Sequence, residues 1–444
     1  MRSLFLGFLL LSILGCSVSE DTDPYFLPPV LFNWELIQTY GGSEEDIAHG
    51  VEVTADGGFI VVGNTQSVDG DFSDKSRSGS DLFLMKFTSE ATLEWTKTYG
   101  GSGDDRGHGV VQLEDGGYAV VGYSQSSDGD ATTNEGQHDN WVFRTDSVGN
   151  IIWQKSFGFL GHDHAYNIIA TTDGGLFFNG FLDVTSAGGA GEVGKQSAKG
   201  LRHGVGEFWC HKIDLNGTIQ WSRYFGGTNN DRSYDALETT AGNFVLVGSS
   251  ESQDFDISNP KGSYDIWIVS LDSKGNLLWE YSLGGSEYDI GKSLIETQNG
   301  ELLIVGQSYS EDKDIQNPLG SSDGILARMS SQGELKALQN FGDSGFDTLT
   351  DVIERPDGTL VLLGNSSSSA EESEAMDNDV ILYYTLPNGD LISSHRLSGQ
   401  GLDLGEKIAI TETGKILVVG STESNSGQFE NTQGSKDLFL AIWN

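Results

Sequence analysis

Paired carboxylates recur in the loops of this sequence and are its first candidates for chemistry. Two loops read DGD, and the matching loops further along the chain read DFD and DKD. The residues concerned are Asp69, Asp71, Asp128, Asp130, Asp254, Asp256, Asp312 and Asp314. Alternating carboxylate oxygens suit a hard cation such as Ca²⁺, and Asp74 adds an acid to the first loop. The complete D-x-D-x-D-G spacing is missing, so solvated carboxylates without a metal are the alternative to calcium as a cofactor.

Other catalytic or metal-binding patterns are weaker. His162 and His164 in GHDHAY could hold a metal together with Asp163, but four convergent zinc ligands cannot be assigned. The sequence contains no G-x-S-x-G nucleophile elbow and no phosphate-binding loop with its lysine. A pair of carboxylates could act as in a glycosidase, but nothing singles out two of them. We therefore name no catalytic residue and favour a protein that is not an enzyme.

One basic cluster stands out against a very acidic chain. With 25 basic and 65 acidic residues the formal charge is −40, which excludes nucleic acid and anionic lipid surfaces as partners. A long loop nevertheless carries four basic or titratable residues, namely Lys195, Lys199, Arg202 and His203. We predict that this loop is a partner-binding rim; an inert insertion is the alternative.

The elements that position these residues form a repeat. An aromatic residue or leucine marks each unit at Tyr40, Tyr99, Phe157, Phe225, Leu283, Phe341 and Leu397, and an aspartate stands six residues past each marker. Runs such as FIVVG, YAVVG and LLIVG recur with the same spacing. The markers show that the sequence contains seven repeat units. The loop with the basic cluster makes the third unit ten residues longer than its neighbours.

Each unit reads as four short strands separated by turns, as in GVEVTA, FIVVGNT, DLFLMKF and TLEWTKTY. A single four-stranded sheet cannot cover both of its faces, whereas blades stacked around an axis can. The fold class is therefore all-β, a seven-bladed β-propeller of four-stranded antiparallel blades. The last unit lacks a fourth strand, and WELIQTY near the start is a fourth strand without its unit. We expect this N-terminal strand to complete the last blade and close the ring.

The domain boundaries follow from the repeat. We expect a propeller over 34–444, with blades at about 47–99, 106–157, 164–225, 232–283, 290–341, 348–397 and 404–443 plus 34–40.

Residues 1–15 read as a signal peptide, because one arginine precedes an apolar run too short to span a bilayer. The run ends in ILGC, which resembles a bacterial lipobox, and this resemblance implies lipid attachment at Cys16 followed by an acidic tether over 16–33. An ordinary signal peptide with an incidental cysteine is the alternative.

The repeat also resembles a known family. The combination of W-x₃-Y-G-G with a downstream aspartate, DGG(F/Y)xVVG, and the acid that opens each third strand is similar to the bacterial seven-bladed β-propeller repeat family, often called SBBP-type. The resemblance covers about Trp34 to Asn444. It implies the propeller fold, and it implies no particular activity.

The function that we predict is binding. We expect a monomeric, non-catalytic lipoprotein of the outer membrane, facing the periplasm or the cell surface, whose loop face binds a protein or a glycan. Aromatic side chains exposed on that face would favour a glycan. The alternative is a calcium-dependent hydrolase or lyase acting on a polysaccharide or phosphate ester, which requires an asymmetric cavity with converging acids and a histidine or tyrosine.

Overall fold

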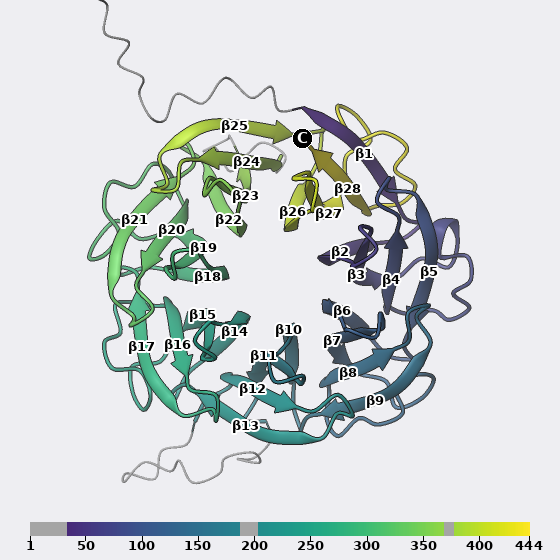
Figure 1. Cartoon of the computed structure of the whole chain (residues 1–444), viewed down its shortest axis with the longest axis horizontal. Helices are drawn as coiled ribbons and strands as arrows, with labels where there is room; N and C mark the ends of the chain where they lie inside the picture. Colours follow the sequence, from purple (N-terminus) through teal and green to yellow (C-terminus); the bar gives the residue numbers. More distant parts are fainter. Residues whose placement is uncertain (1–32, 187–202, 368–376) are drawn as a thin grey trace, which may run out of the picture. The chain divides into compact units, whose positions relative to one another are not determined.

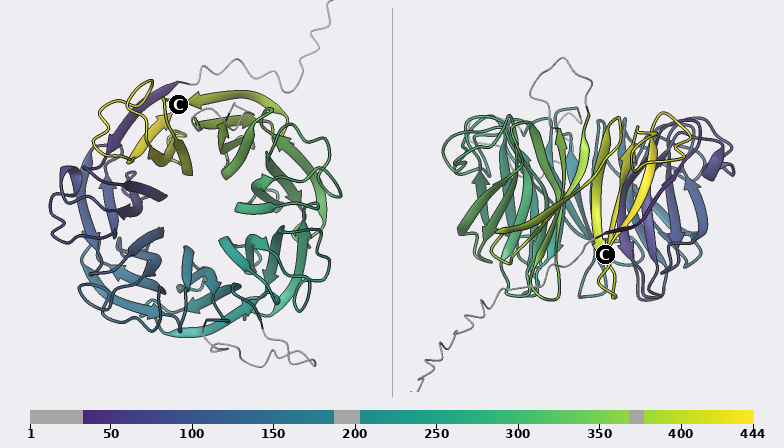
Figure 2. Two further views of the ribbon diagram at one scale, coloured as in Figure 1. Left: turned by 180° about the vertical axis from the view of Figure 1, so that it is seen from behind. Right: turned by 90° about the horizontal axis from the view of Figure 1, so that it is seen from above.

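The computed structural model describes residues 33–186, 203–367 and 377–444. Trp34–Asn444 is one compact unit of seven four-stranded antiparallel sheets. The sheets stand as blades around a central axis (Figure 1), and their strands run between two loop faces in the edge-on view (Figure 2). The predicted seven-bladed β-propeller is therefore confirmed.

In blades 1 to 6 the first strand in the sequence is the innermost and the fourth is the outermost, whereas in blade 7 β26 is innermost and β1 is outermost. Blades 1 and 2 consist of β2 (Asp46–Val53), β3 (Phe59–Thr65), β4 (Asp81–Phe87) and β5 (Leu93–Tyr99), then β6 (Asp105–Gln112), β7 (Tyr118–Ser124), β8 (Asp139–Thr145) and β9 (Ile151–Phe157). Blades 3 and 4 consist of β10 (His164–Ala170), β11 (Leu176–Leu182), β12 (Glu207–Ile213) and β13 (Ile219–Phe225), then β14 (Asp231–Glu238), β15 (Phe244–Ser250), β16 (Asp265–Leu271) and β17 (Leu277–Leu283). Blades 5 and 6 consist of β18 (Asp289–Glu296), β19 (Leu302–Ser308), β20 (Asp323–Met329) and β21 (Leu335–Phe341), then β22 (Phe346–Glu354), β23 (Leu360–Ser367), β24 (Asp379–Thr385) and β25 (Leu391–Leu397). Blade 7 consists of β26 (Asp403–Ile410), β27 (Ile416–Thr422), β28 (Asp437–Trp443) and β1 (Trp34–Tyr40), and the loop of blade 1 holds the short 3₁₀ helix η1 (Gly70–Phe72).

The N-terminal strand closes the ring as predicted. β1 pairs antiparallel with β28, so that Trp34 lies opposite Trp443 and Tyr40 lies opposite Leu438. Tyr40 also belongs to a buried apolar cluster that includes Phe59 of blade 1 and Leu417 of blade 7. The two ends of the propeller are thus joined by a strand pairing and by a shared core.

The core lies between neighbouring blades. The second and third strands are buried along nearly their whole length, and β3 and β4 at every residue, because blades pack against both of their faces. Their continuous runs of Val, Ile, Leu and Phe are typical of strands with two covered faces. The outer strands, such as β5, are only partly buried and carry more polar residues.

Each innermost strand contains a break in register at one residue. In β2 the pairing with β3 shifts between Ala48 and Gly50, so His49 is an extra residue on the channel side. Gly63 lies opposite Ala48, and a Cβ atom at Gly63 would stand 1.9 Å from the carbonyl oxygen of Ile47. The glycine that ends each VVG run is therefore required by the close approach of the bulged strand.

The aspartate that follows each aromatic marker holds the turn between two blades. Asp105 is fully buried, and one of its oxygens accepts hydrogen bonds from the Gly101 amide at 2.7 Å and the Ser126 hydroxyl at 2.7 Å. Asp46, Asp231 and Asp289 make the same two bonds to their own glycine and serine. These side chains satisfy backbone groups in the turn, so their sevenfold recurrence serves the architecture.

Several of these buried aspartates predict a pH-dependent stability. Burial raises the pKa of Asp46, Asp231 and Asp403 to about 6 and that of Asp163 to about 7, against a usual value of 3.8. The folded protein therefore holds these protons more tightly than the unfolded chain does. The stabilisation is complete below the unfolded pKa and is lost as the pH rises through 6 to 7.

We expect the melting temperature to fall by several degrees between pH 5 and pH 8, since one pKa unit corresponds to about 1.4 kcal/mol. Differential scanning calorimetry over this range measures the effect. Asp46→Asn removes one titrating group while it keeps an oxygen for the Gly42 amide, so the fall should be smaller in that variant. A melting temperature that is constant or rises with pH in the unmodified protein would contradict the assignment.

Candidate functional site

The central channel holds a cavity of about 600 Å³ that is lined mainly by the innermost strands. The bulged residue of every innermost strand lies on its wall, and these seven positions hold five different residue types. They are His49, His108, Tyr166, Tyr234, Lys292, Thr350 and Glu406. The bulge is common to all blades, so the repeat presents one variable side chain per blade to the channel.

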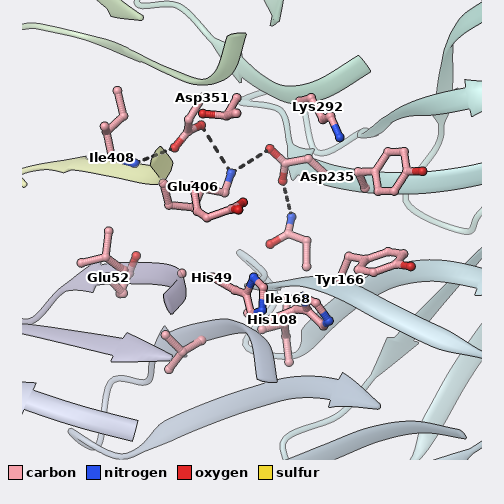
Figure 3. A pocket seen from close by; sticks show the side chains of 18 of the residues that line it. His49, Glu52, His108, Tyr166, Ile168, Asp235, Lys292, Asp351, Glu406 and Ile408 are labelled. Atoms are coloured by element: carbon pink, nitrogen blue, oxygen red, sulfur yellow. Dashed lines mark hydrogen bonds and ion pairs between the residues drawn. The ribbon is translucent and has the colours of Figure 1, made fainter. Parts of the chain in front are cut away.

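The residue after each bulge divides the channel into two unlike sides. In blade order these residues are Gly50, Gly109, Asn167, Asp235, Ser293, Asp351 and Lys407. Blades 1 and 2 have no side chain here, whereas the other five blades carry polar groups. Figure 3 shows His49, His108 and Glu52 across the cavity from Asp235 and Asp351.

A polar network joins the five blades with side chains. The Lys407 ammonium lies 3.5 Å from Asp235 Oδ2 and 3.3 Å from Asp351 Oδ1. The Ser293 hydroxyl oxygen lies 2.7 Å from each of the same two carboxylate oxygens, and Asn167 Nδ2 donates to Asp235 Oδ1 at 2.6 Å. Burial lowers the pKa of Lys407, but the Asp235 and Asp351 carboxylates together outweigh this effect and raise the pKa above its usual value, so this side chain is charged at neutral pH.

Backbone amides also occupy the two carboxylates of this network. The amide of Ala236 donates to Asp235 Oδ1 at 2.9 Å, and the amide of Leu294 donates to Oδ2 at 3.2 Å. The amide of Ile408 donates to Asp351 Oδ2 at 3.0 Å. All four carboxylate oxygens therefore have donors within the protein, and the network links five neighbouring blades.

The opposite side of the cavity is less polar. His49 Nε2 lies 2.9 Å from Asn64 Oδ1, and the rings of His49 and His108 are 4.6 Å apart. Burial lowers the pKa of both histidines, so they are neutral. Burial also raises the pKa of Glu52 to about 7. This wall offers neutral imidazoles and one weakly acidic carboxyl group to a ligand.

Aromatic side chains form an arc on the loop face, defined as the face that carries the turns between blades. Tyr264, Tyr288, Tyr309 and Phe346 make this aromatic arc across blades 4 to 6, with successive ring centroids 4.8, 6.2 and 6.4 Å apart. Tyr288, Tyr309 and Phe346 are exposed at 39%, 38% and 42%. The equivalent positions in blade 1 and at the start of blade 2 hold acidic or polar residues, so the arc is a feature of one side of the ring.

The structure places the predicted calcium-binding aspartates against the same turns as the aspartates described above. In the first loop Asp69 accepts the Ser43 amide at 2.8 Å and Asp71 accepts the Gly41 amide at 2.9 Å. The pairs Asp128 and Asp130, Asp254 and Asp256, and Asp312 and Asp314 bond the matching amides of their own turns. These bonds explain the recurrence of the pairs without a metal, and calcium binding stays a prediction.

The other predicted site residues lie mostly outside the described residues. Of the basic cluster, Lys195, Lys199 and Arg202 do so, and Cys16 does as well. His203 is buried, and its Nδ1 lies 2.8 Å from Glu207 Oε2 at the start of β12. Within the described part of the chain, no helix is long and apolar enough to cross a membrane.

Sequence reasoning missed the channel network and the aromatic arc. Both sit at repeat positions where the residue type changes between units, such as Asp235 and Lys407 at a position that is glycine in the first two blades. The signal that could have revealed them is a change of residue type at one position of the repeat when the seven units are aligned.

Comparisons with known proteins support the fold and leave the family open. No family model matches the chain. A curated relative, the regulatory protein FlaEY of Caulobacter vibrioides, is 24% identical over 410 residues, which cover 81% of this chain and 41% of that protein. Among solved structures, the Pan2 WD40 domain of Neurospora crassa has a TM-score of 0.51 at 10% identity and covers 93% of this chain and 94% of its own. The protein is thus similar in fold to a WD40 propeller, and it spans about two fifths of its curated relative.

The channel network predicts a large cost for removing its cation. In Lys407→Met the two carboxylates lose their positive partner, and the free energy of unfolding should fall by about 3 kcal/mol. Lys336→Met is the matched control, because its ion pair with Glu301 is exposed and should contribute about 0–1 kcal/mol. Urea denaturation of both variants measures the difference, and equal losses would show that the channel pair is no stronger than a surface pair.

Proposed function

We propose that this propeller is a non-catalytic binding protein that takes a neutral glycan against the aromatic arc at the mouth of its channel. The observation that carries the proposal is the exposure of three neighbouring aromatic rings, Tyr288, Tyr309 and Phe346, on the loop face. Fold requirements do not explain this exposure, because large apolar groups gain free energy from burial.

Polar groups beside the arc suit the hydroxyl groups of a sugar. Gln307 Nε2 donates to the Tyr309 hydroxyl at 3.3 Å and to the Ser322 hydroxyl at 2.9 Å. Tyr264 accepts from Asn230 Nδ2 at 3.1 Å and donates to Glu251 Oε2 at 3.1 Å. A sugar ring presents C–H groups on its face and hydroxyl groups at its edge, so flat aromatic rings flanked by amides and hydroxyls match both.

The charge of the protein narrows the class of glycan. A formal charge of −40 repels polyanions, and Glu251 lies next to the arc itself. A neutral polysaccharide or oligosaccharide is therefore the expected ligand. A protein partner would also use exposed aromatic residues, and the experiment below separates the two.

The cavity meets only part of what a hydrolase or lyase would need. Asp235 and Asp351 converge, and histidines and tyrosines share the same cavity. Both carboxylates, however, already accept backbone amides and face the Lys407 ammonium. This occupancy favours binding over catalysis.

The proposal also places the propeller at the bacterial envelope through a lipid on Cys16. The support is the resemblance of ILGC to a lipobox at the end of a short apolar run.

Removing the exposed rings should abolish glycan binding. Affinity gel electrophoresis through dextran, mannan, laminarin, xylan and the anionic alginate gives the readout. We expect retardation by at least one neutral polysaccharide, no retardation by alginate, and loss of the effect in Tyr288→Ala/Tyr309→Ala. Leu278→Ala is the control, since this side chain is 50% exposed on the outer strand β17 and is not part of the arc.

The glycan proposal is wrong if no neutral polysaccharide retards the protein, or if the double variant migrates as the unmodified protein does. Capture of a specific protein that depends on Tyr288 and Tyr309, with no glycan binding, would assign the arc to a protein partner instead.

The lipid anchor has its own test. In Cys16→Ser the acylated residue is lost, so the protein should move from the membrane fraction to the soluble fraction of cells that express the full chain. Ser17→Ala is the matched control and should leave the protein with the membranes. Retention of Cys16→Ser in the membrane fraction would remove the anchor from the proposal.

A further inference from the structure

Three histidines come together on the loop face where blade 2 meets blade 3. We infer that His138, His162 and His164 bind one divalent transition-metal ion such as Zn²⁺. One nitrogen of each ring lies within 4.8 Å of the other two. The site goes beyond the proposed glycan binding and does not depend on it.

The nitrogen atoms are spaced as metal ligands require, with small adjustments. His138 Nδ1 lies 2.7 Å from His162 Nδ1 and 3.3 Å from His164 Nε2. Tetrahedral zinc with bonds of about 2.0–2.1 Å places its ligand atoms about 3.3 Å apart. The His138–His164 pair already has this separation, and the His138–His162 pair reaches it through a small rotation of partly buried rings. For the third pair, His162 and His164, the rings offer nitrogen atoms within 4.8 Å of each other, and the same rotation would bring them closer.

The backbone holds the three residues in place from two blades. His138 immediately precedes β8, and His164 is the first residue of β10. An isolated parallel bridge joins the backbones of His138 and His162 across the gap between the blades. A metal here would add a link between two blades at a point that is already fixed by hydrogen bonds.

Neighbouring rings orient His164 for this role. Tyr123 stacks on the imidazole with centroids 3.9 Å apart and an angle of 19°. The Tyr166 hydroxyl lies 3.5 Å from His164 Nδ1, within reach of the proton that this nitrogen carries when Nε2 binds a metal. Such an outer partner is typical of metal-binding histidines.

The fold itself does not require histidines at these positions. The residues equivalent to His138 in the other blades are Ser80, Gly206, Tyr264, Ser322, Asn378 and Lys436, and those equivalent to His162 are Glu45, Asp104, Asn230, Tyr288, Phe346 and Leu402. The chain has eight histidines, and three of them meet at one junction. This concentration is the independent reason to assign them a ligand.

The donor set determines the class of metal. Three imidazole nitrogens suit Zn²⁺, Ni²⁺ or Cu²⁺ and do not suit Ca²⁺ or Mg²⁺, which require oxygen ligands. The sequence suggested Asp163 as a third ligand, but Asp163 is fully buried and accepts the amides of Phe159 and Asp183 at 2.8 Å each. His138 takes its place, and a fourth position is left for water or a ligand.

Charged neighbours partly oppose a cation. Arg106 lies near the cluster, and its Nε donates to Asp104 Oδ1 at 3.0 Å, which offsets its charge. Arg232 lies over the Phe181 ring at 4.5 Å, and that ring is 4.8 Å from His164. Against these, the large negative charge of the protein attracts cations from solution.

Isothermal titration of the full chain with ZnCl₂, after removal of metal by a chelator, tests the site. We expect one Zn²⁺ per chain, and a loss of affinity of about tenfold or more in His138→Gln and in His162→Gln. His395→Gln on the outer strand β25 is the matched control and should bind as the unmodified protein does. CaCl₂ in place of ZnCl₂ should neither bind at this site nor displace Zn²⁺.

A second readout separates the loss of a metal ligand from misfolding of the variant. Co²⁺ in place of Zn²⁺ gives visible absorption bands of high intensity when it is four-coordinate, and these bands should be lost in His162→Gln while circular dichroism shows an intact propeller. Zn²⁺ binding that persists in a folded His138→Gln/His162→Gln variant, or no binding by the unmodified protein, would overturn the assignment.

Discussion

The pairing of β1 with β28 is the interaction on which the rest of the structure depends. Each blade has two apolar faces and is stable only between two neighbours, so an open array would leave two faces exposed. Strand β1 carries Tyr40 into the cluster shared by blades 1 and 7, and it covers the edge of β28 that would otherwise be unpaired. The channel exists because this closure gives all seven innermost strands a common axis.

The fold could be predicted because its requirements repeat. Position 63 requires glycine because a Cβ atom there would collide with the backbone of the bulged strand. Asp105 accepts hydrogen bonds from the turn between two blades. The same two requirements arise in every blade. Because the glycine and the aspartate each recur seven times, the sequence reveals both the repeat length and the positions of the strands. The missing strand of the last unit then indicated the closure.

The candidate site could not be predicted in the same way, for two physical reasons. Asp235, Asp351 and Lys407 are far apart in the sequence and meet only because the ring brings their blades together. The bulge also turns an additional residue of each innermost strand toward the channel, and a simple alternation of strand residues does not reveal which one. The DGD pairs show the opposite case: they are conspicuous in the sequence, yet Asp69 and Asp71 bond backbone amides of a turn.

Both proposed binding sites use positions where the repeat varies, and the structure connects those positions. Ring contacts run from His164 to Tyr166 at 6.2 Å and from Tyr166 to Tyr234 at 5.4 Å, and the Lys292 ammonium lies 5.2 Å from the Tyr234 ring. His164 belongs to the histidine cluster, whereas Tyr166, Tyr234 and Lys292 line the channel. A ligand at the channel mouth would contact aromatic side chains from several blades at once. The architecture supplies equivalent positions, and the differences between them make one side of a sevenfold ring suited to recognition.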